Sequence, residues 1–228
     1  MADAERERPD FTTAAGRRRF YLERGLRRRS IGAGSNMEML MQSPRAMLFV
    51  TMDELFGDVP AAIVGGVAAR AYAPERVTHD LDVLVDHGRY AEAARALEQR
   101  GWQCLNELTF PNTMLGLYGV AWSKDERKLD LIASPQPWAA EALGVEAYDQ
   151  TGARVVALPY LVLMKLDSAR GIDQGDLSRM LGRASTSDVD QTVRVVERHS
   201  GDPHAAEDVR QYAELGALEY LRPDLGEK

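Results

Sequence analysis

The chain has 228 residues, of which 45% are hydrophobic and 28% charged, so it is long enough to bury the core of an ordinary globular domain. Its net charge of −7 excludes a protein that coats nucleic acids generally, because that mode of binding needs many phosphate-neutralising Lys and Arg side chains. The single cysteine, Cys104, excludes an internal disulfide, a cysteine-based zinc cage and an iron–sulfur cluster, and it indicates a reducing compartment.

The first 35 residues differ from the rest of the chain in charge. They carry nine arginines and five acidic residues, and seven of the arginines fall within residues 17–29. This composition predicts a flexible, solvated tail over residues 1–35. The alternative is a short docking helix, because Phe20, Leu22 and Leu26 form one weak apolar stripe at helical spacing. The charged opening of the chain lacks the apolar segment of a signal peptide.

Hydrophobic periodicity and turn residues predict an α+β domain followed by a helical C-terminal third. Helices are expected over residues 45–56, 65–72, 89–100, 137–143 and 159–170. Strands are expected over residues 61–64, 78–85, 102–110, 115–123, 128–133 and 154–158. The last third is predicted to be helical, over residues 173–181, 188–199 and 203–221. We therefore divide the chain into a tail (1–35), an α+β sheet domain (36–182) and C-terminal helices packed on that domain (183–228).

The most apolar run, residues 155–164, is too short to cross a membrane. It has ten residues and is interrupted by Pro159, whereas a spanning helix needs about 20. We therefore expect a cytoplasmic protein with no membrane partner.

Two aspartates occupy alternate positions of the strand expected over 78–85. Alternation turns the carboxylates of Asp80 and Asp82 to one face, opposite Val83. Their mutual repulsion is unfavourable unless cations lie between them. Mg²⁺ takes such oxygen ligands and keeps positions open for water or phosphates, and two metal ions about 4 Å apart can hold the attacking and leaving oxygens of a phosphoryl transfer. The pair predicts a metal site.

Gly65 and Gly66 end a strand and begin a helix. Without Cβ atoms they let backbone N–H groups approach a phosphate at the positive end of the helix. A glycine pair alone is most often a tight turn. With thirteen residues between Gly66 and Asp80, in a strand–turn–helix–strand context, the two features together predict a nucleotide site.

Asp130 is the candidate for a third carboxylate. It is a single acid between apolar neighbours in the strand expected over 128–133, where an unpaired buried charge would be costly. One interpretation is a metal ligand and general base, and the other is a solvent-facing strand position, which alternation also permits.

These patterns resemble the nucleotidyltransferase superfamily, in which an apolar strand is followed by Gly-Gly or Gly-Ser, then by Asp-x-Asp/Glu, and later by a single Asp. More narrowly, the chain is similar to the branch that contains toxins of abortive-infection toxin–antitoxin systems. The similarity covers roughly residues 45–182. The motifs that carry it are Gly65-Gly66-x-Ala68, Arg76-x-Thr78-x-Asp80-Leu81-Asp82, Leu163-Met164-Lys165-Leu166 and Arg170-x-x-Asp173-x-x-Asp176-Leu177.

The resemblance implies a nucleotidyltransferase-like fold, in which a mixed β-sheet is flanked by helices over residues 36–182. It also implies a cofactor and a set of site residues. It implies Mg²⁺, with Mn²⁺ as a substitute, held by Asp80, Asp82 and Asp130. It also implies an NTP phosphate site at Gly65-Gly66. It further suggests that Lys165 contacts the triphosphate and that Asp176 orients Lys165 or the nucleotide.

Two of the basic residues have structural alternatives. Lys165 lies on an apolar helix face, so its ammonium group could simply extend to solvent. Arg76 could pair with Asp80 or Asp82 in the absence of metal, or it could contact the nucleotide.

The function we expect is Mg²⁺-dependent transfer of a nucleoside monophosphate from an NTP to a hydroxyl of an RNA, a protein or a small molecule. Asp80 and Asp82 would hold the metal ions, and Asp130 would bind one of them and help to deprotonate the acceptor. A role as the toxin of a pair with an antitoxin partner is the narrower form of this hypothesis. The alternatives are a non-catalytic nucleotidyltransferase-like binding module and a protein that docks RNA or an acidic partner through its arginine-rich tail.

Overall fold

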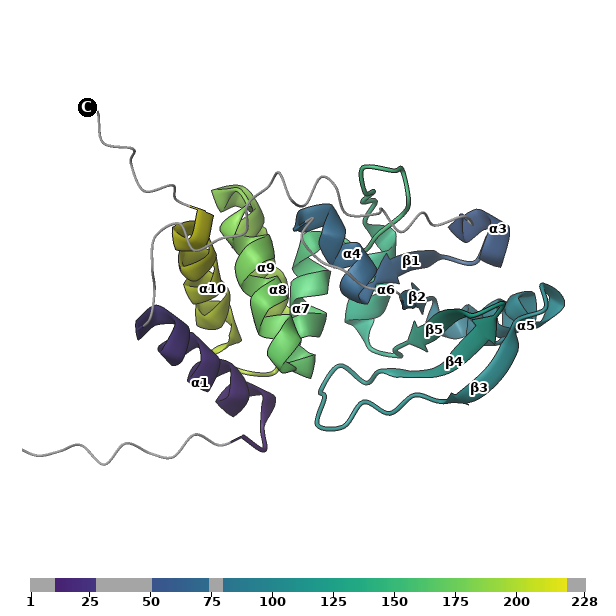
Figure 1. Ribbon diagram of the computed structural model, residues 1–228, viewed down its shortest axis with the longest axis horizontal. Helices are drawn as coiled ribbons and strands as arrows, with labels where there is room; N and C mark the ends of the chain where they lie inside the picture. The colour runs from purple at the N-terminus through teal and green to yellow at the C-terminus, as the bar shows by residue number, and fades with distance from the viewer. Residues whose placement is uncertain (1–10, 28–50, 74–79, 221–228) are drawn as a thin grey trace, which may run out of the picture.

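A mixed five-stranded sheet forms one part of the molecule, and a group of packed helices forms the other (Figure 1). This computed structural model describes residues 11–27, 51–73 and 80–220. The fold class predicted from the sequence is confirmed: the protein is α+β, with a mixed sheet flanked by helices and a helical C-terminal part. None of the helices in the described ranges is both long and apolar enough to cross a bilayer.

The elements follow the predicted order closely. The strands are β1 (Ala61–Val64), β2 (Leu81–Val85), β3 (Gln103–Glu107), β4 (Tyr118–Lys124) and β5 (Arg127–Ala133). The helices that flank the sheet are α3 (Met52–Phe56), α4 (Gly65–Tyr72), α5 (Tyr90–Gln99), which follows the 3₁₀ turn η1 (His87–Arg89), and α6 (Pro137–Gly144). The remaining helices are α1 (Ala14–Arg27), α7 (Leu158–Ser168), α8 (Gly171–Gly182), α9 (Thr186–His199) and α10 (Ala205–Tyr220).

The strand order in the sheet is β1-β2-β5-β4-β3. The strands β2 and β5 run parallel, and the other three pairs are antiparallel. All four residues of β1 are buried, which suits its unbroken apolar sequence. The strands β2 and β5 therefore lie side by side in the middle of the sheet, each carrying a polar residue among apolar ones.

The C-terminal helices pack closely on one another. In α10, Gly216 lies so near α8 that a Cβ atom there would come within 1.8 Å of the carbonyl oxygen of Ser178. Only glycine permits this approach of the two backbones. The helix α7 lies between these helices and the sheet, and nearly all of its residues are buried.

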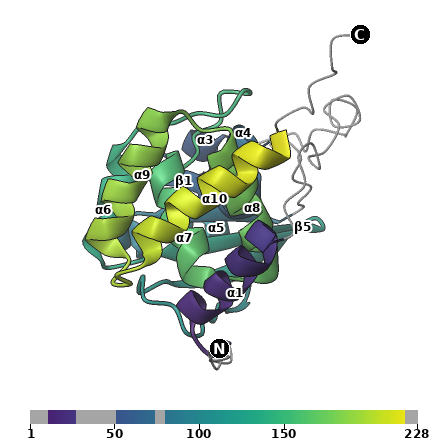
Figure 2. The same ribbon diagram turned by 90° about the vertical axis from the view of Figure 1, so that its left-hand side faces the viewer.

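The N-terminal segment differs from the flexible tail that its composition predicts. Residues 14–27 form α1, which packs against α7 and α10 (Figure 2). Leu22 is 1% exposed, as in the alternative of a docking helix. Arg18 is 2% exposed. It donates hydrogen bonds to Asp208 at 2.9 Å and to the carbonyl oxygen of Leu166 at 2.6 Å, and it also pairs with Asp202.

Three expected elements have different extents. The strand expected over 154–158 is reduced to isolated bridges, of which one joins Val155 to Ile63, because α7 already begins at Leu158. The strand expected over 102–110 ends at Glu107, and the following residues form a loop before β4. Of the helix expected over 45–56, the structure describes only the part that forms α3, which Thr51 caps.

Candidate functional site

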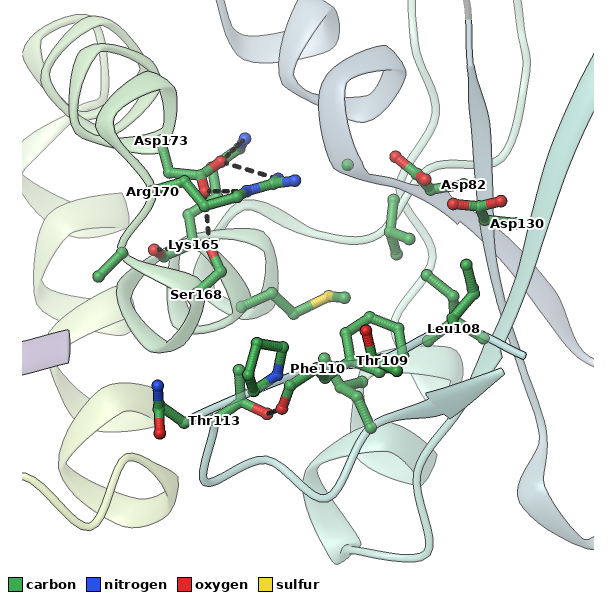
Figure 3. A pocket seen from close by; sticks show the side chains of 18 of the residues that line it. Asp82, Leu108, Thr109, Phe110, Thr113, Asp130, Lys165, Ser168, Arg170 and Asp173 are labelled. Atoms are coloured by element: carbon green, nitrogen blue, oxygen red, sulfur yellow. Dashed lines mark hydrogen bonds and ion pairs between the residues drawn. The ribbon is translucent and has the colours of Figure 1, made fainter. Parts of the chain in front are cut away.

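A cavity of about 550 Å³ lies between the sheet, α7 and the start of α8 (Figure 3). Its charged lining residues are Arg17, Asp82, Asp130, Lys165, Arg170 and Asp173. Its apolar wall comes mainly from β5, α7 and the loop after β3, with Leu108 and Phe110 contributed by that loop. This volume is in the range of cavities that hold small-molecule ligands.

Asp82 and Asp130 are direct partners in the register of the parallel strands β2 and β5. Residues paired in this way project to the same face of a sheet. Figure 3 shows both side chains at the same edge of the cavity, with Asp82 extending toward Arg170 on the other side. The structure therefore brings these two predicted residues together, and Asp130 is not a solvent-facing strand residue.

Gly65 fits against the carboxylate of Asp82. A Cβ atom at this position would come within 1.8 Å of Asp82 Oδ2, and the backbone has a φ of +66°. Both facts require glycine, one because of space and the other because of backbone conformation. Gly65 begins α4 with no side-chain cap from Val64, so the first N–H groups of that helix lie close to the acidic residues.

The carboxylates of Asp82 and Asp130 lie close together, and their negative charges are only partly offset by nearby positive charges. Burial raises the pKa of Asp82 to about 6, and repulsion from Asp130 and Asp80 adds to this effect against the opposing charges of Arg170 and Lys165. Burial and the charge of Asp80 also raise the pKa of Asp130. Within the described ranges, neither carboxylate forms an ion pair or a hydrogen bond. Such a pair is stabilised by a bound cation.

The acidic residues fit a divalent cation in part. Asp82 and Asp130 offer oxygen ligands on one edge of the cavity, the donor type that Mg²⁺ and Mn²⁺ prefer. Asp80 immediately precedes β2, is exposed, and is not part of the cavity lining. Residues 11–27, 51–73 and 80–220 contain no group of three metal-binding side chains already gathered around one point. The geometry thus supplies two ligands in place and a third within electrostatic reach.

Lys165 is the centre of a buried ionic cluster. Its ammonium group is 2.7 Å from Asp176 Oδ2 and 3.1 Å from Asp173 Oδ1, and its side chain is 4% exposed. Asp173 also accepts a hydrogen bond from Ser168. The interpretation of Lys165 as a side chain extending to solvent is therefore wrong, because two buried carboxylates bind its charge.

Arg170 connects this cluster to the cavity. Its guanidinium donates to both carboxylate oxygens of Asp173, at 2.8 and 3.3 Å, while 68% of its side chain remains exposed. Burial opposes the charge of Asp173, but the hydrogen bond from Arg170 and the charge of Lys165 outweigh it and lower the pKa of that carboxyl group. The ion pair with Asp173 raises the pKa of Arg170. Arg170 is thus a fixed cation that faces the acidic pair across the cavity (Figure 3).

The other predicted residues take various positions. Gly66 is buried inside α4, and Gly65 alone of the pair lines the cavity. Asp176 is 2% exposed and accepts from Lys165, in keeping with the orienting role that the resemblance suggests. Arg76 lies outside the described residues, so its expected contact with the acids or the nucleotide stays a prediction.

Three lining residues were given no role from the sequence. Arg170 appears in the quoted motif, and its i,i+3 spacing to Asp173 is a local signal that could have identified it. Arg17 and Tyr21 reach the cavity from α1, far away in the sequence. No local pattern predicts their position, because it depends on how α1 docks.

Comparisons with known proteins find structural neighbours only. No protein-family model matches the chain, and no curated protein matches it. The chain is similar to a solution structure of the antibiotic-resistance factor ANT(2'')-Ia and to a crystal structure of ANT(2")-Ia in complex with adenylyl-2"-tobramycin. Both share 18% identity with it at a TM-score of 0.37, over 72% of this chain and 84% and 90% of the neighbours. A likeness of this degree assigns neither a family nor an activity to this chain.

Proposed function

We propose that the protein is a nucleotidyltransferase that moves a nucleoside monophosphate from an NTP to a hydroxyl acceptor. The observation that carries the proposal is the convergence of Asp82, Asp130 and Gly65 at one edge of the cavity. Two adjacent carboxylates without a cation, beside a helix start that only glycine can form, suit a metal-bound triphosphate. The sequence motifs add the third acid, Asp80.

In this proposal Mg²⁺, or Mn²⁺ in its place, would be held by Asp82 and Asp130 with Asp80 as a further ligand. When bound, the metal supplies charge neutralisation at the phosphate that is attacked. Asp130 lines the cavity and has a raised pKa, so it would help to accept the proton of the acceptor hydroxyl. The N–H groups at the start of α4 would hold a phosphate oxygen.

We assign the main contact with the triphosphate to Arg170. Its guanidinium is exposed to the cavity and directed toward Asp82, whereas two carboxylates already bind the ammonium group of Lys165. The nucleotide contact predicted for Lys165 stays a prediction. Its supported role is to hold Asp173, which in turn fixes Arg170.

The sequence motifs favour a hydroxyl acceptor without specifying the molecule that carries it. An RNA, a protein and a small molecule each offer the required hydroxyl. The toxin role, with an antitoxin as partner, rests on the resemblance of the two motifs around Gly65 and Lys165. A non-catalytic nucleotide-binding module is the alternative, and it differs in one measurable property: it would bind NTP without releasing pyrophosphate.

The test is transfer of label from each of the four α-³²P-labelled NTPs in the presence of Mg²⁺ and cell extract. We expect one labelled product class with the unaltered protein and none with Asp82→Asn or Asp130→Asn. Asp125→Asn is the matched control, because Asp125 is an exposed residue between β4 and β5 that does not line the cavity. Nucleotide binding without transfer by the unaltered protein would favour the non-catalytic module. Full activity of Asp82→Asn would contradict the proposed site.

A further inference from the structure

The helix α1 forms a wall of the cavity, although its sequence looks like that of a tail. It contributes Arg17 and Tyr21, which stand at i and i+4 and so lie on the same side of the helix. The helix is anchored by the buried Arg18, whose ion pairs reach Asp202 and Asp208. Arg17 and Tyr21 are therefore presented from a docked element, and their position relative to α8 is defined.

Arg17 brings to the cavity a charge that no carboxylate neutralises. Its guanidinium donates to the carbonyl oxygen of Ala169 at 3.3 Å and to that of Ser168 at 3.5 Å. Its two other acceptors are the carbonyl oxygens of Phe11 and Thr12. Among the residues that the structure describes, Arg17 has no ion pair. The contacts orient the side chain while leaving its positive charge available to an anion.

Tyr21 places a hydroxyl group next to the start of α8. Its side chain is 43% exposed, and its ring packs edge-on against Phe20 with centroids 5.7 Å apart. The hydroxyl lies beside Gly171, where a Cβ atom would be in ordinary contact with it at 3.5 Å. Within residues 11–27, 51–73 and 80–220, the hydroxyl has no hydrogen-bond partner. Because Gly171 follows Arg170 directly, this hydroxyl and the Arg170 backbone are neighbours.

We infer that Arg17 and Tyr21 bind the distal phosphates of the nucleotide, an inference that rests on the proposed function. The cavity has an acidic edge at Asp82 and Asp130, where a metal-bound phosphate is expected, and a basic region at α1 and the start of α8. A triphosphate attached at the acidic edge extends toward that basic region. Arg17 supplies charge there, and the Tyr21 hydroxyl donates a hydrogen bond to a phosphate oxygen. Arg17, one residue of the arginine-rich segment, thus serves polyphosphate binding inside the cavity.

The decisive variant is Tyr21→Phe, which removes one oxygen that has no partner in the described structure. Isothermal titration of the full chain with Mg²⁺ would compare a non-hydrolysable ATP analogue, inorganic tripolyphosphate and AMP. A lost hydrogen bond to a charged group corresponds to roughly a tenfold weaker affinity. We expect that loss for the analogue and for tripolyphosphate, and no change for AMP. Tyr148→Phe is the control, because Tyr148 is 56% exposed and does not line the cavity.

The charge is tested by Arg17→Gln against Arg24→Gln. Both changes remove one arginine charge from α1, but Arg24 is exposed and is not part of the cavity lining. We expect tripolyphosphate binding to weaken about tenfold in the first variant and less than twofold in the second, as for a surface charge screened by salt. Proteolytic resistance of α1 in each variant shows whether the helix stays docked.

The outcomes separate this inference from the proposed function. If Tyr21→Phe binds tripolyphosphate as tightly as the unaltered protein does, the proposed role of α1 is overturned. The role is also overturned if Tyr21→Phe loses affinity for AMP and for the ATP analogue to the same extent. In either case a loss in Arg170→Ala would leave the proposed nucleotide site standing. Failure of the unaltered protein to bind any NTP would overturn both.

Discussion

Two charged groups face each other across the cavity, and they are constructed in opposite ways. On the α7–α8 side, Lys165, Arg170 and Asp173 satisfy one another at distances of 2.8–3.1 Å. On the sheet side, Asp82 and Asp130 stand in register, and no basic side chain in the described part of the chain forms an ion pair with them. The first group has its charges neutralised within the protein, whereas the second would gain a positive charge from the ligand that we propose. We therefore expect mutations in the first group to change stability and mutations in the second to change binding.

The largest effect on stability is expected for Lys165→Ala. This change leaves Asp176 and Asp173 buried without their shared cation, and breaking a buried ion pair on one side typically costs about 3–5 kcal/mol. Urea denaturation followed by circular dichroism measures the loss. The double variant Lys165→Met/Asp176→Leu, which removes charge on both sides, should recover much of it. A loss below about 1 kcal/mol, the value of a surface pair, would contradict the description of a structural cluster.

The acidic pair should make stability depend on pH in a defined direction. The folded pKa of Asp82 is raised from 3.8 to about 6, so the folded state holds this proton more tightly than the unfolded state. The resulting stability is present below pH 4 and is lost as the pH rises to about 6, by on the order of 3 kcal/mol. Urea titrations between pH 4 and 7 should show this loss in the unaltered protein and a smaller loss in Asp82→Asn, in which Asp130 still has a raised pKa. Identical pH profiles of the two proteins would contradict it.

Binding of a metal-bound nucleotide should restore folding stability that the protein loses as the pH rises. A metal-bound nucleotide at 100 times its Kd stabilises the folded state by about 2.7 kcal/mol through mass action. We expect Mg²⁺ with a non-hydrolysable NTP to raise the melting temperature of the unaltered protein but not that of Asp82→Asn. Asp125→Asn should show the full shift. The same shift in all three proteins would place the metal elsewhere.

The smallest effect on stability is expected for Arg170→Ala, although this residue belongs to the satisfied cluster. Its side chain is 68% exposed, and ion pairs of exposed side chains contribute about 1 kcal/mol or less. Asp173 keeps its bond to Lys165 in this variant. Tripolyphosphate affinity, by contrast, should fall about tenfold or more with the loss of one charged donor. A large loss of stability with unchanged affinity would reverse the roles we assign to Arg170 and Lys165.

The sequence was informative where the physics is local. Alternation in β2 predicted which way Asp82 points, and the glycine that follows β1 marked the start of α4. For Asp130, alternation permitted either a site position or a solvent-facing one. The parallel pairing that puts Asp82 opposite Asp130 completes the arrangement. The expectation for Lys165 was less complete. Its partners stand 8 and 11 residues further along, on the next helix, and only the packing of α7 on α8 brings them to it.

The sequence was least informative for α1. An arginine in a basic segment is normally solvated, and composition therefore favoured a tail. The burial of Arg18 depends on Asp202 and Asp208, which lie 184 and 190 residues away. The arginine and these acids are too far apart in the sequence for a local pattern to connect them. The same distance explains why Arg17 and Tyr21 were not predicted to reach the cavity.

The anchoring of α1 also sets an order of events during synthesis. The residues of α1 leave the ribosome before those of the sheet, but the acids that bind Arg18 are translated after the sheet. While domains generally fold from their N-terminal side as they emerge, Arg18 has no acidic partner from this pair until residues 202 and 208 have been made. A nascent chain can therefore assemble the sheet and its acidic pair before the wall formed by α1 is in place. The cavity is completed only after Asp202 and Asp208, which anchor α1, have been translated.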